Sequence, residues 1–354
     1  MSESPHIVVV KLAALGDVVM ASTLVDAIRS RWPNAHLTWV TGEAFAPLVT
    51  RLSGIDRVVP VNTTQLLRGG WGARAYALQA VWRRLHGPVY HLGVVAHTDA
   101  RYDALLWGVR VRERRALRNG RGPGLLGALG ARDDRPRAPR PGQWMGADYA
   151  RLVLPDDVDD ADGSSPCLAR LTLEPALVDA ASEAAGAVVL APGGARNVLR
   201  DDPLRRWPIA HWITLARALR DGGHRVLLVG AAEDRPESQA IMTAVPGVET
   251  AVGRTSLLEL VALLSRARLL VSHDSGTLHL AMLTRTPAVA LFGPTAPAER
   301  VPAGMPVVVA SAAAGLPCAP CYDGRAYARC ALNRCLTELS SARVLVMVDE
   351  LLRA

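Results

Sequence analysis

The sequence predicts an α/β protein of two domains, each a doubly wound parallel sheet of the Rossmann type. A strand–turn–helix–strand pattern occupies residues 7–40, and a second one occupies residues 269–292. From residue 188 onward, strand and helix patterns alternate five times, which is typical of a parallel sheet covered by helices. The acidic stretch 156–166 contains few apolar residues and is typical of a linker or a domain edge.

A length of 354 residues suits two domains, each able to bury its own core. We place them at 1–170 and 171–338, and the second domain includes a cysteine-rich segment at 318–335. Residues 339–354 form an amphipathic helix of a kind that can cross back onto the first domain.

Composition points to a protein of the cytoplasm. Half of the residues are apolar and the mean hydropathy is +0.16, but no run approaches the ~20 apolar residues that a membrane-spanning helix needs. The first residues contain neither a basic region nor a long apolar stretch, so they do not resemble a signal peptide. Arginine supplies 39 of the 40 basic residues, and Lys11 is the only lysine.

The first pattern places two charged residues at one edge of the first sheet. Residues 7–10 form a buried-type strand, 11–16 a small-residue turn and 18–31 a helix. Gly16 and Asp17 therefore lie at a helix N-terminus and Lys11 at a strand end. Asp17 is explained equally by helix capping, and Lys11 by a solvated strand end. Both lie, however, where open α/β sheets bind ligands.

An arginine-rich segment follows a helix near 76–85 and a strand at 92–95. Residues 101–140 contain 11 arginines and four acidic residues, an excess of seven that equals the net charge of the whole chain. Such a run is usually a solvated face, and residues 118–142 suit a mobile loop. The functional alternative is an anionic acceptor at a membrane surface, contacted by Arg101, Arg110 and Arg112. No aromatic interleaving accompanies the arginines, so we do not expect nucleic acid as a partner.

The second domain begins with a strand at 188–190 and a loop that contains Gly193 and Gly194. Arg205 and Arg206 precede Trp-Pro and a helix at 209–220, and they suit bidentate binding of a diphosphate or a solvated helix start equally well. Glu233 follows the strand 225–229. It suits ribose hydroxyls, although such a residue is more often a surface acid. The sequence contains no Gly-x-Gly-x-x-Gly after a strand, which argues against a dinucleotide oxidoreductase.

The second strand–turn–helix–strand pattern is the strongest candidate for an anion site. A helix at 277–284 follows the strand 269–271 and is opened by Asp274, Ser275 and Gly276. Asp or Ser at this place caps backbone N–H groups, and glycine allows close approach to the backbone. An isolated Asp-Ser-Gly is best explained as a cap. His279, one turn further on the same side, shifts the balance toward a phosphate site.

These residues resemble a known family. Asp274-x-Gly276-x-x-His279, then Pro287 and Phe292-Gly-Pro-Thr295, is similar to the nucleotide-diphosphate-sugar motif of the heptosyltransferases of glycosyltransferase family nine. The N-terminal Ile-Val-Val-Val-Lys-x5-Asp-Val is also similar to that family. The resemblance spans almost the whole chain and is weakest in the arginine-rich segment.

The resemblance implies the GT-B fold, in which two Rossmann-like domains face each other across a cleft. It implies an inverting, metal-independent transfer of a heptose from ADP-heptose to a hydroxyl of a lipopolysaccharide core or a similar glycolipid. Asp17 becomes the catalytic base, Lys11 lies near the donor phosphates, and Arg205 contacts the diphosphate. No cofactor is required, and peripheral membrane contact follows from the acceptor. The absence of an Asp-x-Asp motif agrees with transfer without a metal.

Two alternatives remain within the same fold. One is a transferase that uses another nucleotide sugar or a natural-product acceptor. The other is a sugar-nucleotide epimerase, for which we expect more carboxylates and histidines around the cleft than Asp17 alone.

Four of the five cysteines are close in sequence. Cys318, Cys321, Cys330 and Cys335 have spacings that suggest a structural zinc site with four thiolates. The eight-residue gap is short for a zinc ribbon, so reduced thiols packed in a loop, or disulfides in an oxidising compartment, are equal alternatives.

Overall fold

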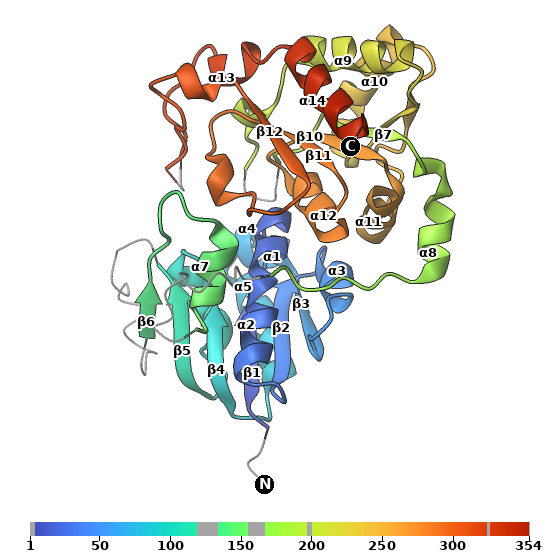
Figure 1. Cartoon of the computed structure of the whole chain (residues 1–354). Helices are drawn as coiled ribbons and strands as arrows, with labels where there is room; N and C mark the ends of the chain where they lie inside the picture. Colours follow the sequence, from blue (N-terminus) through green and yellow to red (C-terminus); the bar gives the residue numbers. More distant parts are fainter. Residues whose placement is uncertain (1–3, 119–133, 155–166, 197–199, 324–325, 354) are drawn as a thin grey trace. The chain divides into compact units, whose positions relative to one another are not determined.

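A computed structural model of the protein describes residues 4–118, 134–154, 167–196, 200–323 and 326–353. The chain divides into two compact units, Met1–Thr172 and Leu173–Ala354. Each unit contains one six-stranded sheet whose neighbouring strands are all parallel (Figure 1). In the part of the chain that is described, no helix is long and apolar enough to cross a membrane.

The first sheet is built around the strand that precedes Lys11. Its strand order is β3-β2-β1-β4-β5-β6, so the chain reverses direction across the sheet between β1 and β4. Residues 7–10 of β1 are fully buried, as expected for a strand covered on both faces. The strands are β1 (His6–Val10), β2 (His36–Gly42), β3 (Arg57–Val61), β4 (Tyr90–Val95), β5 (Val111–Leu117) and β6 (Asp134–Arg137).

The helix predicted at 18–31 consists of two helices. It is divided at Ser22, whose hydroxyl accepts a hydrogen bond from the backbone N–H of Ala169 (3.0 Å). Both helices pack against α7, and Thr23 donates a hydrogen bond to the carbonyl of Gly146 (2.7 Å) (Figure 1). The helices of this unit are α1 (Leu15–Ala21), α2 (Thr23–Arg31), α3 (Ala46–Thr50), α4 (Thr63–Arg68), α5 (Trp71–Leu85), the 3-10 helix η1 (Ala100–Leu106) and α7 (Met145–Arg151).

The arginine-rich segment is partly a buried strand, which corrects the expectation of a solvated face. Arg115 and Arg118 are 8% and 7% exposed, and β5 contains the first of them. Arg115 pairs with Glu113 (2.6 Å) and also donates to backbone carbonyls at the end of α7. Arginines are tolerated here because each charge has a partner within the unit. Of the loop expected at 118–142, residues 119–133 lie outside the described residues.

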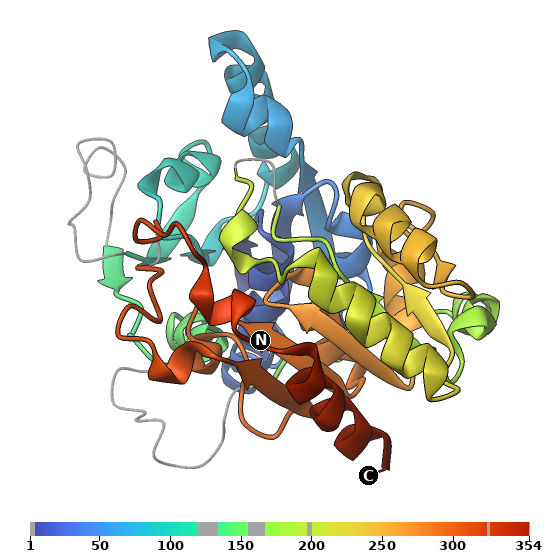
Figure 2. The same ribbon diagram turned by 90° about the horizontal axis from the view of Figure 1, so that it is seen from above.

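The second sheet has the strand order β12-β11-β10-β7-β8-β9, with the reversal between β7 and β10. Its strands are β7 (Val188–Ala191), β8 (Val226–Leu228), β9 (Glu249–Thr250), β10 (Leu269–His273), β11 (Ala288–Phe292) and β12 (Val307–Ser311). The helices are α8 (Pro175–Ala180), α9 (Ile209–Asp221), α10 (Arg235–Ala244), α11 (Leu257–Arg266), α12 (Gly276–Thr284), α13 (Arg334–Thr337) and α14 (Ser341–Arg353), with short 3-10 turns η3 (Ala181–Ala184), η4 (Pro203–Arg205), η5 (Ala232–Asp234), η6 (Pro297–Glu299) and η7 (Ala313–Gly315). Helix α14, which we considered able to cross back onto the first domain, packs against α9 and strands β10 to β12 (Figures 1 and 2).

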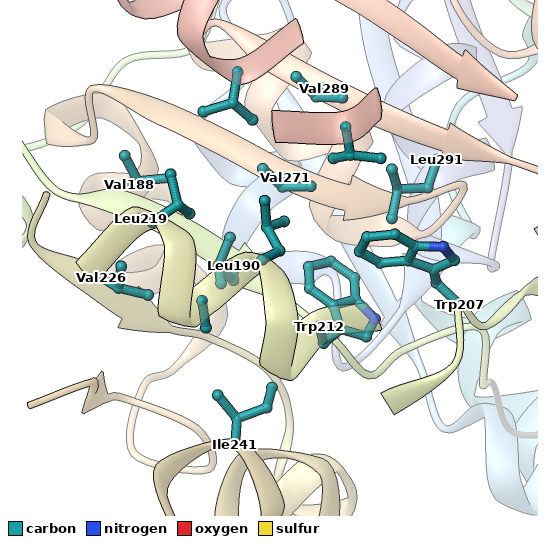
Figure 3. Close-up of a cluster of buried hydrophobic side chains, with 14 of the residues drawn as sticks. Val188, Leu190, Trp207, Trp212, Leu219, Val226, Ile241, Val271, Val289 and Leu291 are labelled. Carbon is teal, nitrogen blue, oxygen red and sulfur yellow. The ribbon is translucent and has the colours of Figure 1, made fainter. Parts of the chain in front are cut away.

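A hydrophobic core between the second sheet and its helices fixes the loop that precedes α9. Trp212 is fully buried and Trp207 is 2% exposed, and their rings meet edge to face with centroids 5.2 Å apart (Figure 3). They pack in one cluster with Val271 and Leu291 of the sheet. The indole N–H of Trp207 donates to the carbonyl of Leu339 (2.8 Å), which satisfies its only polar atom. The residues just before Trp207 are therefore held firmly at the sheet.

Candidate functional site

The strongest candidate site lies at the carboxyl end of β10, where α12 begins. This position is next to the strand-order reversal of the second sheet, which is where open α/β sheets bind ligands. Ser275 is the extended residue before α12, and its hydroxyl hydrogen-bonds with that of Ser272 (3.1 Å). The first backbone N–H groups of α12 have no partner within the helix, and they provide partial positive charge at its start.

Asp274 is buried (3% exposed) and collects three partners from different segments. It accepts hydrogen bonds from Thr295 (2.8 Å) and from Arg205 (3.3 Å), and His279 Nε2 lies 3.8 Å from it. Burial alone raises the pKa of Asp274, but Arg205, with His279 and Arg300, more than reverses this effect and holds the pKa well below its usual range. Asp274 is therefore an anion that orients two cationic or polar side chains around the start of α12.

Two buried nitrogen atoms in this cluster lack partners. His279 Nδ1 and Arg205 Nε are both inaccessible to solvent, and neither forms a hydrogen bond within the described part of the chain. A buried donor or acceptor without a partner is costly, and native proteins rarely keep one outside a functional site. Buried side-chain atoms without a partner also occur elsewhere in the described residues, for example Trp39 Nε1 and Trp212 Nε1, so the pair by itself does not identify a ligand site. In this cluster the two atoms are unused hydrogen-bonding groups next to Asp274.

His273 supports the loops around the cluster and was missed by the sequence analysis. Its Nε2 accepts a hydrogen bond from the backbone N–H of Trp207 (2.7 Å), and its Nδ1 lies 3.2 Å from the carbonyl of Gly193. Nδ1 therefore carries the proton in a neutral ring. Burial lowers the pKa of His273 to about 4, with Arg205 and Arg206 acting in the same direction against the hydrogen bond to Gly193. No spacing signal precedes this histidine, which is the last residue of a buried strand and directly follows Ser272.

The acid that organises the loop after β8 is Asp234, not Glu233. Glu233 is exposed, whereas Asp234 is 4% exposed and accepts hydrogen bonds from the backbone N–H groups of Ala231 (2.9 Å) and Gly194 (3.0 Å). A Cβ atom at Gly193 would lie 2.2 Å from the Asp234 carboxyl group, so this close approach requires glycine. Gly194 has φ +85°, a conformation that also favours glycine.

Arg206 has different partners from its neighbour Arg205, which pairs with Asp274. Its Nε donates to the carbonyl of Gly194 (3.0 Å), and its guanidinium pairs with Asp201. The two predicted diphosphate ligands therefore differ: Arg205 points into the Asp274 cluster, and Arg206 stabilises the glycine loop. The exposed Glu233 has no part in this network, and its proposed contact with ribose stays a prediction.

The cysteine-rich segment packs on the turn that carries Thr295. The backbone N–H groups of Cys321 and Tyr322 both point to the carbonyl of Pro294 (2.9 and 3.1 Å). Tyr322 and Tyr327 pair as an isolated bridge, with ring centroids 4.8 Å apart. This segment therefore lies next to the Asp274 cluster through the Pro294–Thr295 turn.

The structure gives no support to the predicted zinc site. Cys318, Cys321, Cys330 and Cys335 are all free, and the described residues contain no group of three side chains able to hold a metal ion. Burial raises the pKa of Cys335 to about 11, so this residue is a neutral thiol at physiological pH. The observations agree with reduced thiols, of which only Cys335 is buried.

A second cluster surrounds Lys11 in the first unit. Lys11 is 3% exposed, and its ammonium donates to the carbonyl of Ala96 (2.9 Å) and to the hydroxyl of Tyr149 (2.8 Å). It also lies 3.7 Å from Asp17, whose side chain is 35% exposed. Asp17 accepts a long hydrogen bond from the backbone N–H of Ala14 (3.4 Å), which is the capping contact foreseen from the sequence. Gly16 lies beside it in the first turn of α1.

His97 and Tyr102 form the other side of this cluster. His97 Nε2 accepts the backbone N–H of Leu12 (2.9 Å), and its ring stacks on Tyr102 with centroids 3.8 Å apart. Burial lowers the pKa of His97 well below its usual value, and Lys11 and Arg118 add to the effect. Like His273, this histidine is a neutral acceptor for a backbone N–H group. The sequence analysis did not single it out.

The three arginines proposed for the acceptor are at the surface. Arg101 forms short hydrogen bonds with Asp99 (2.6 Å at the closest), and Arg110 donates to the carbonyl of Gly87 (2.7 Å). Arg112 is exposed on β5. Their proposed role is not decided by this geometry.

Residues 165–330 match the family described as glycosyltransferase family 9 (heptosyltransferase). The chain is also 25% identical to lipooligosaccharide heptosyltransferase 2 of Haemophilus influenzae, over 82% of this chain and 84% of that protein. The resemblance seen in the motifs is confirmed by these matches.

Solved structures share the fold over the whole chain. A family 9 glycosyltransferase from Veillonella parvula has a TM-score of 0.81 at 20% identity, covering 100% of this chain and 99% of that one. The Escherichia coli heptosyltransferase WaaC with ADP-2-deoxy-2-fluoro heptose has a TM-score of 0.68 at 19% identity, covering 98% and 99%. With the two parallel sheets, these likenesses confirm the GT-B class.

Proposed function

We propose that this chain, whose residues 165–330 match glycosyltransferase family 9, transfers a heptose from ADP-heptose to a hydroxyl of a lipopolysaccharide core or a similar glycolipid. The family match and the heptosyltransferase relatives support the sugar, and the acceptor follows from the same relatives. One observation carries the donor site: two buried nitrogen atoms without partners, one in Arg205 and one in His279, flank Asp274 at the start of α12.

The donor is assigned to the second unit. Arg205 Nε and the free N–H groups of α12 suit the diphosphate, since cationic and backbone donors stabilise the charge of a leaving diphosphate. Asp274 holds the Arg205 guanidinium through Nη1 (3.3 Å), whereas its buried Nε forms no hydrogen bond within the described residues. Gly193 and Gly194 expose backbone close to Ser275, where a Cβ at Gly194 would lie 3.3 Å away. These groups supply, in this proposal, the positive charge that a divalent ion supplies elsewhere.

Asp17 is the proposed general base. Its side chain is partly exposed at the start of α1, and it is a carboxylate next to a cation. It takes the proton of the acceptor hydroxyl while the hydroxyl oxygen bonds to the anomeric carbon and the bond to the diphosphate breaks. Attack opposite the leaving group inverts the anomeric configuration. Ordinary carboxylate basicity suffices, because the proton is transferred as the new bond forms.

The acceptor is proposed to be anionic and presented at a membrane surface. Arg112 is exposed, and Arg101 and Arg110 are exposed but paired with groups of their own unit. A phosphorylated glycolipid must therefore compete with those partners or bind Arg112 first. We expect no role for nucleic acid.

Thermal stability with nucleotides tests the donor site first. We expect ADP and ADP-heptose, but not UDP or GDP, to raise the melting temperature, and Asp274→Asn to abolish the increase by releasing Arg205. Glu233→Gln is a matched control in which an exposed acid after β8 is neutralised. This variant weakens the binding of ADP, and so reduces the rise in melting temperature, only if Glu233 binds ribose. A shift with UDP alone would redirect the donor assignment to another nucleotide sugar. No shift with any nucleotide would refute the transferase proposal.

A further inference from the structure

The α4–α5 pair carries the most exposed large apolar side chain of the described residues. Trp71, the first residue of α5, is 91% exposed, and Tyr76, five residues further along the helix, is 64% exposed. Figure 2 shows this pair of helices (light blue) extending away from the rest of its unit. Exposed tryptophan of this extent needs an explanation, because it is strongly favoured at protein or membrane contacts.

The end of α4, the turn at Gly69 and Gly70 and the start of α5 form the exposed tip of this helix pair, called the α4–α5 tip below. Asn62 caps α4 by accepting the backbone N–H of Gln65 (2.8 Å), and α4 ends at Arg68. A Cβ at Gly69 would lie 2.3 Å from the carbonyl oxygen of Gln65, so the turn closes only with glycine there. Gly70 follows and brings Trp71 to the start of the next helix.

Only the far half of α5 is anchored in the core. Its buried residues are Ala77, Val81 and Leu85, which are spaced four apart and form a single stripe. The first turn of α5, with Trp71, contributes no buried residue. The tip is therefore held in place by a rigid helix and is itself uncovered.

The positive charge of α4 and α5 favours an anionic lipid surface as the partner. Residues 57–98 contain five arginines and no acidic residue, and the four arginines on α4 and α5 (Arg68, Arg74, Arg83 and Arg84) are exposed. Tryptophan and tyrosine prefer the boundary between lipid headgroups and acyl chains, and arginine is attracted to anionic headgroups. A protein partner would be expected to offer carboxylates in addition to an apolar groove.

We propose that the α4–α5 tip docks this protein on an anionic lipid bilayer, with Trp71 and Tyr76 at the headgroup boundary and the arginines on the phosphates. The biological meaning rests on the proposed glycolipid acceptor, but the docking itself does not. It places the membrane contact on α4 and α5, outside the arginine-rich segment at 101–140.

Vesicle sedimentation tests the docking with the full chain. We expect binding to vesicles of equal parts phosphatidylglycerol and phosphatidylcholine, and little binding to phosphatidylcholine alone. Trp71→Ala is expected to weaken binding to the vesicles at least tenfold. In the double variant Arg68→Gln/Arg74→Gln, each arginine removed is expected to weaken binding roughly fivefold. Leu332→Ala is the matched control, an exposed apolar residue (69%) of the second unit, and it is expected to bind as the unaltered chain does.

Two results would overturn the docking proposal. One is equal binding by the Trp71→Ala variant and the unaltered chain. The other is loss of binding on Arg112→Gln alone, which would return the contact to the arginine-rich segment. The ADP-dependent rise in melting temperature is measured without lipid, so failure of the donor site and failure of the docking are separate outcomes.

A second inference concerns Lys11, the only lysine among 40 basic residues. Its ammonium points in three directions from one buried position: to the Ala96 carbonyl, to the Tyr149 hydroxyl and toward Asp17. A compact ammonium can do this, whereas the planar, larger guanidinium of arginine cannot. This geometry explains why lysine stands here in a chain that otherwise uses arginine.

We infer that Lys11 is a positioning residue for Asp17 and does not bind the donor diphosphate. Two of its three N–H groups donate to groups of its own unit at 2.8 and 2.9 Å, and the Lys11 side chain is only 4% exposed. The remaining direction faces Asp17. The inference rests on the proposed role of Asp17 as base, and it assigns to Lys11 the stabilisation of the Asp17 carboxylate.

Lys11→Met separates the two roles. If Lys11 positions Asp17, the ADP-dependent rise in melting temperature is kept and the KM for the donor changes little. In that case kcat falls, and the acidic limb of the pH–rate profile moves up by about one pH unit, because a carboxylate without its cation is a weaker acid. Tyr149→Phe, which removes one partner of Lys11 and keeps the ring, is expected to lower kcat in the same direction with a smaller shift.

Loss of the ADP-dependent rise in melting temperature in Lys11→Met would instead indicate that Lys11 binds the donor diphosphate. An unmoved acidic limb in both variants would refute the positioning role, even if kcat falls, because a merely structural defect leaves that limb in place. Full activity of Asp17→Asn would instead remove the proposed base, and this result is distinct from either outcome for Lys11.

Discussion

The buried, neutral His273 makes the stability of the second unit depend on pH. Its pKa is lowered to about 4 by burial, against about 6.5 in an unfolded chain. The unfolded state therefore binds the proton more tightly than the folded state. Stability is complete above about pH 6.5 and is lost as the pH falls from there toward about 4.

The size of the loss follows from the two values. Between pH 7 and pH 5 the unfolded histidine becomes almost fully protonated, while the folded one stays mostly neutral, and the free energy of unfolding falls by about 2 kcal/mol. Protonation in the folded state would turn Nε2 from acceptor into donor and break its 2.7 Å contact with the Trp207 N–H group. The loop that carries Arg205 would then lose a main anchor.

Urea unfolding at pH 7 and pH 5, followed by tryptophan fluorescence, measures this directly. Trp212 is a local reporter, since its ring lies 5.2 Å from that of His273. His273→Gln keeps an acceptor for Trp207 but does not titrate, so the variant should be less stable at pH 7 and lose about 2 kcal/mol less than the unaltered chain on going to pH 5. An identical pH dependence in both proteins would refute the reasoning.

Three further predictions follow from the loops and ion pairs. Gly193→Ala is expected to destabilise the second unit by about 1–3 kcal/mol in urea unfolding and to weaken the binding of ADP, because the new Cβ would lie 2.2 Å from Asp234. An unchanged stability and an unchanged affinity for ADP would contradict that contact. Asp234→Asn should weaken ADP binding in calorimetry more than Glu233→Gln does, and the reverse order would favour the ribose contact. Asp103→Asn should cost the first unit about 3 kcal/mol by leaving the buried Arg118 (7% exposed) unpaired, measured as a lowered urea midpoint.

Much of the candidate site at the start of α12 was predictable because its signals are local. Asp274 and Gly276 follow a buried strand and specify where the next helix begins. The structure places both residues at the start of α12. His279 follows one turn later by helical periodicity alone. These residues lie close in sequence, so spacing is enough to bring them together.

Supporting residues were not predictable, since they act through contacts distant in sequence. His273 bonds to Trp207 and Gly193, which are 66 and 80 residues away. His97 and Leu12 are 85 residues apart. Glu233 was singled out and Asp234 was not considered, because a sequence position after a strand does not say which side chain turns inward.

The arginine-rich segment also shows that local sequence does not predict burial. Charge density predicts solvation, but Arg115 and Arg118 are buried because Glu113 and Asp103 meet them. A charge run says nothing of its partners, whose positions depend on strand pairing.

The sequence by itself determined the fold class of this protein: two parallel sheets and a helix that begins at the end of a buried strand. It also revealed the resemblance to glycosyltransferase family 9. Those features depend on periodicity, capping and short spacings, which act within a few residues. The tertiary structure decided which acid organises each loop, which arginines are buried and what Lys11 contacts. Such choices depend on desolvation and hydrogen bonding between distant segments, and their free energies are fixed only when those segments meet.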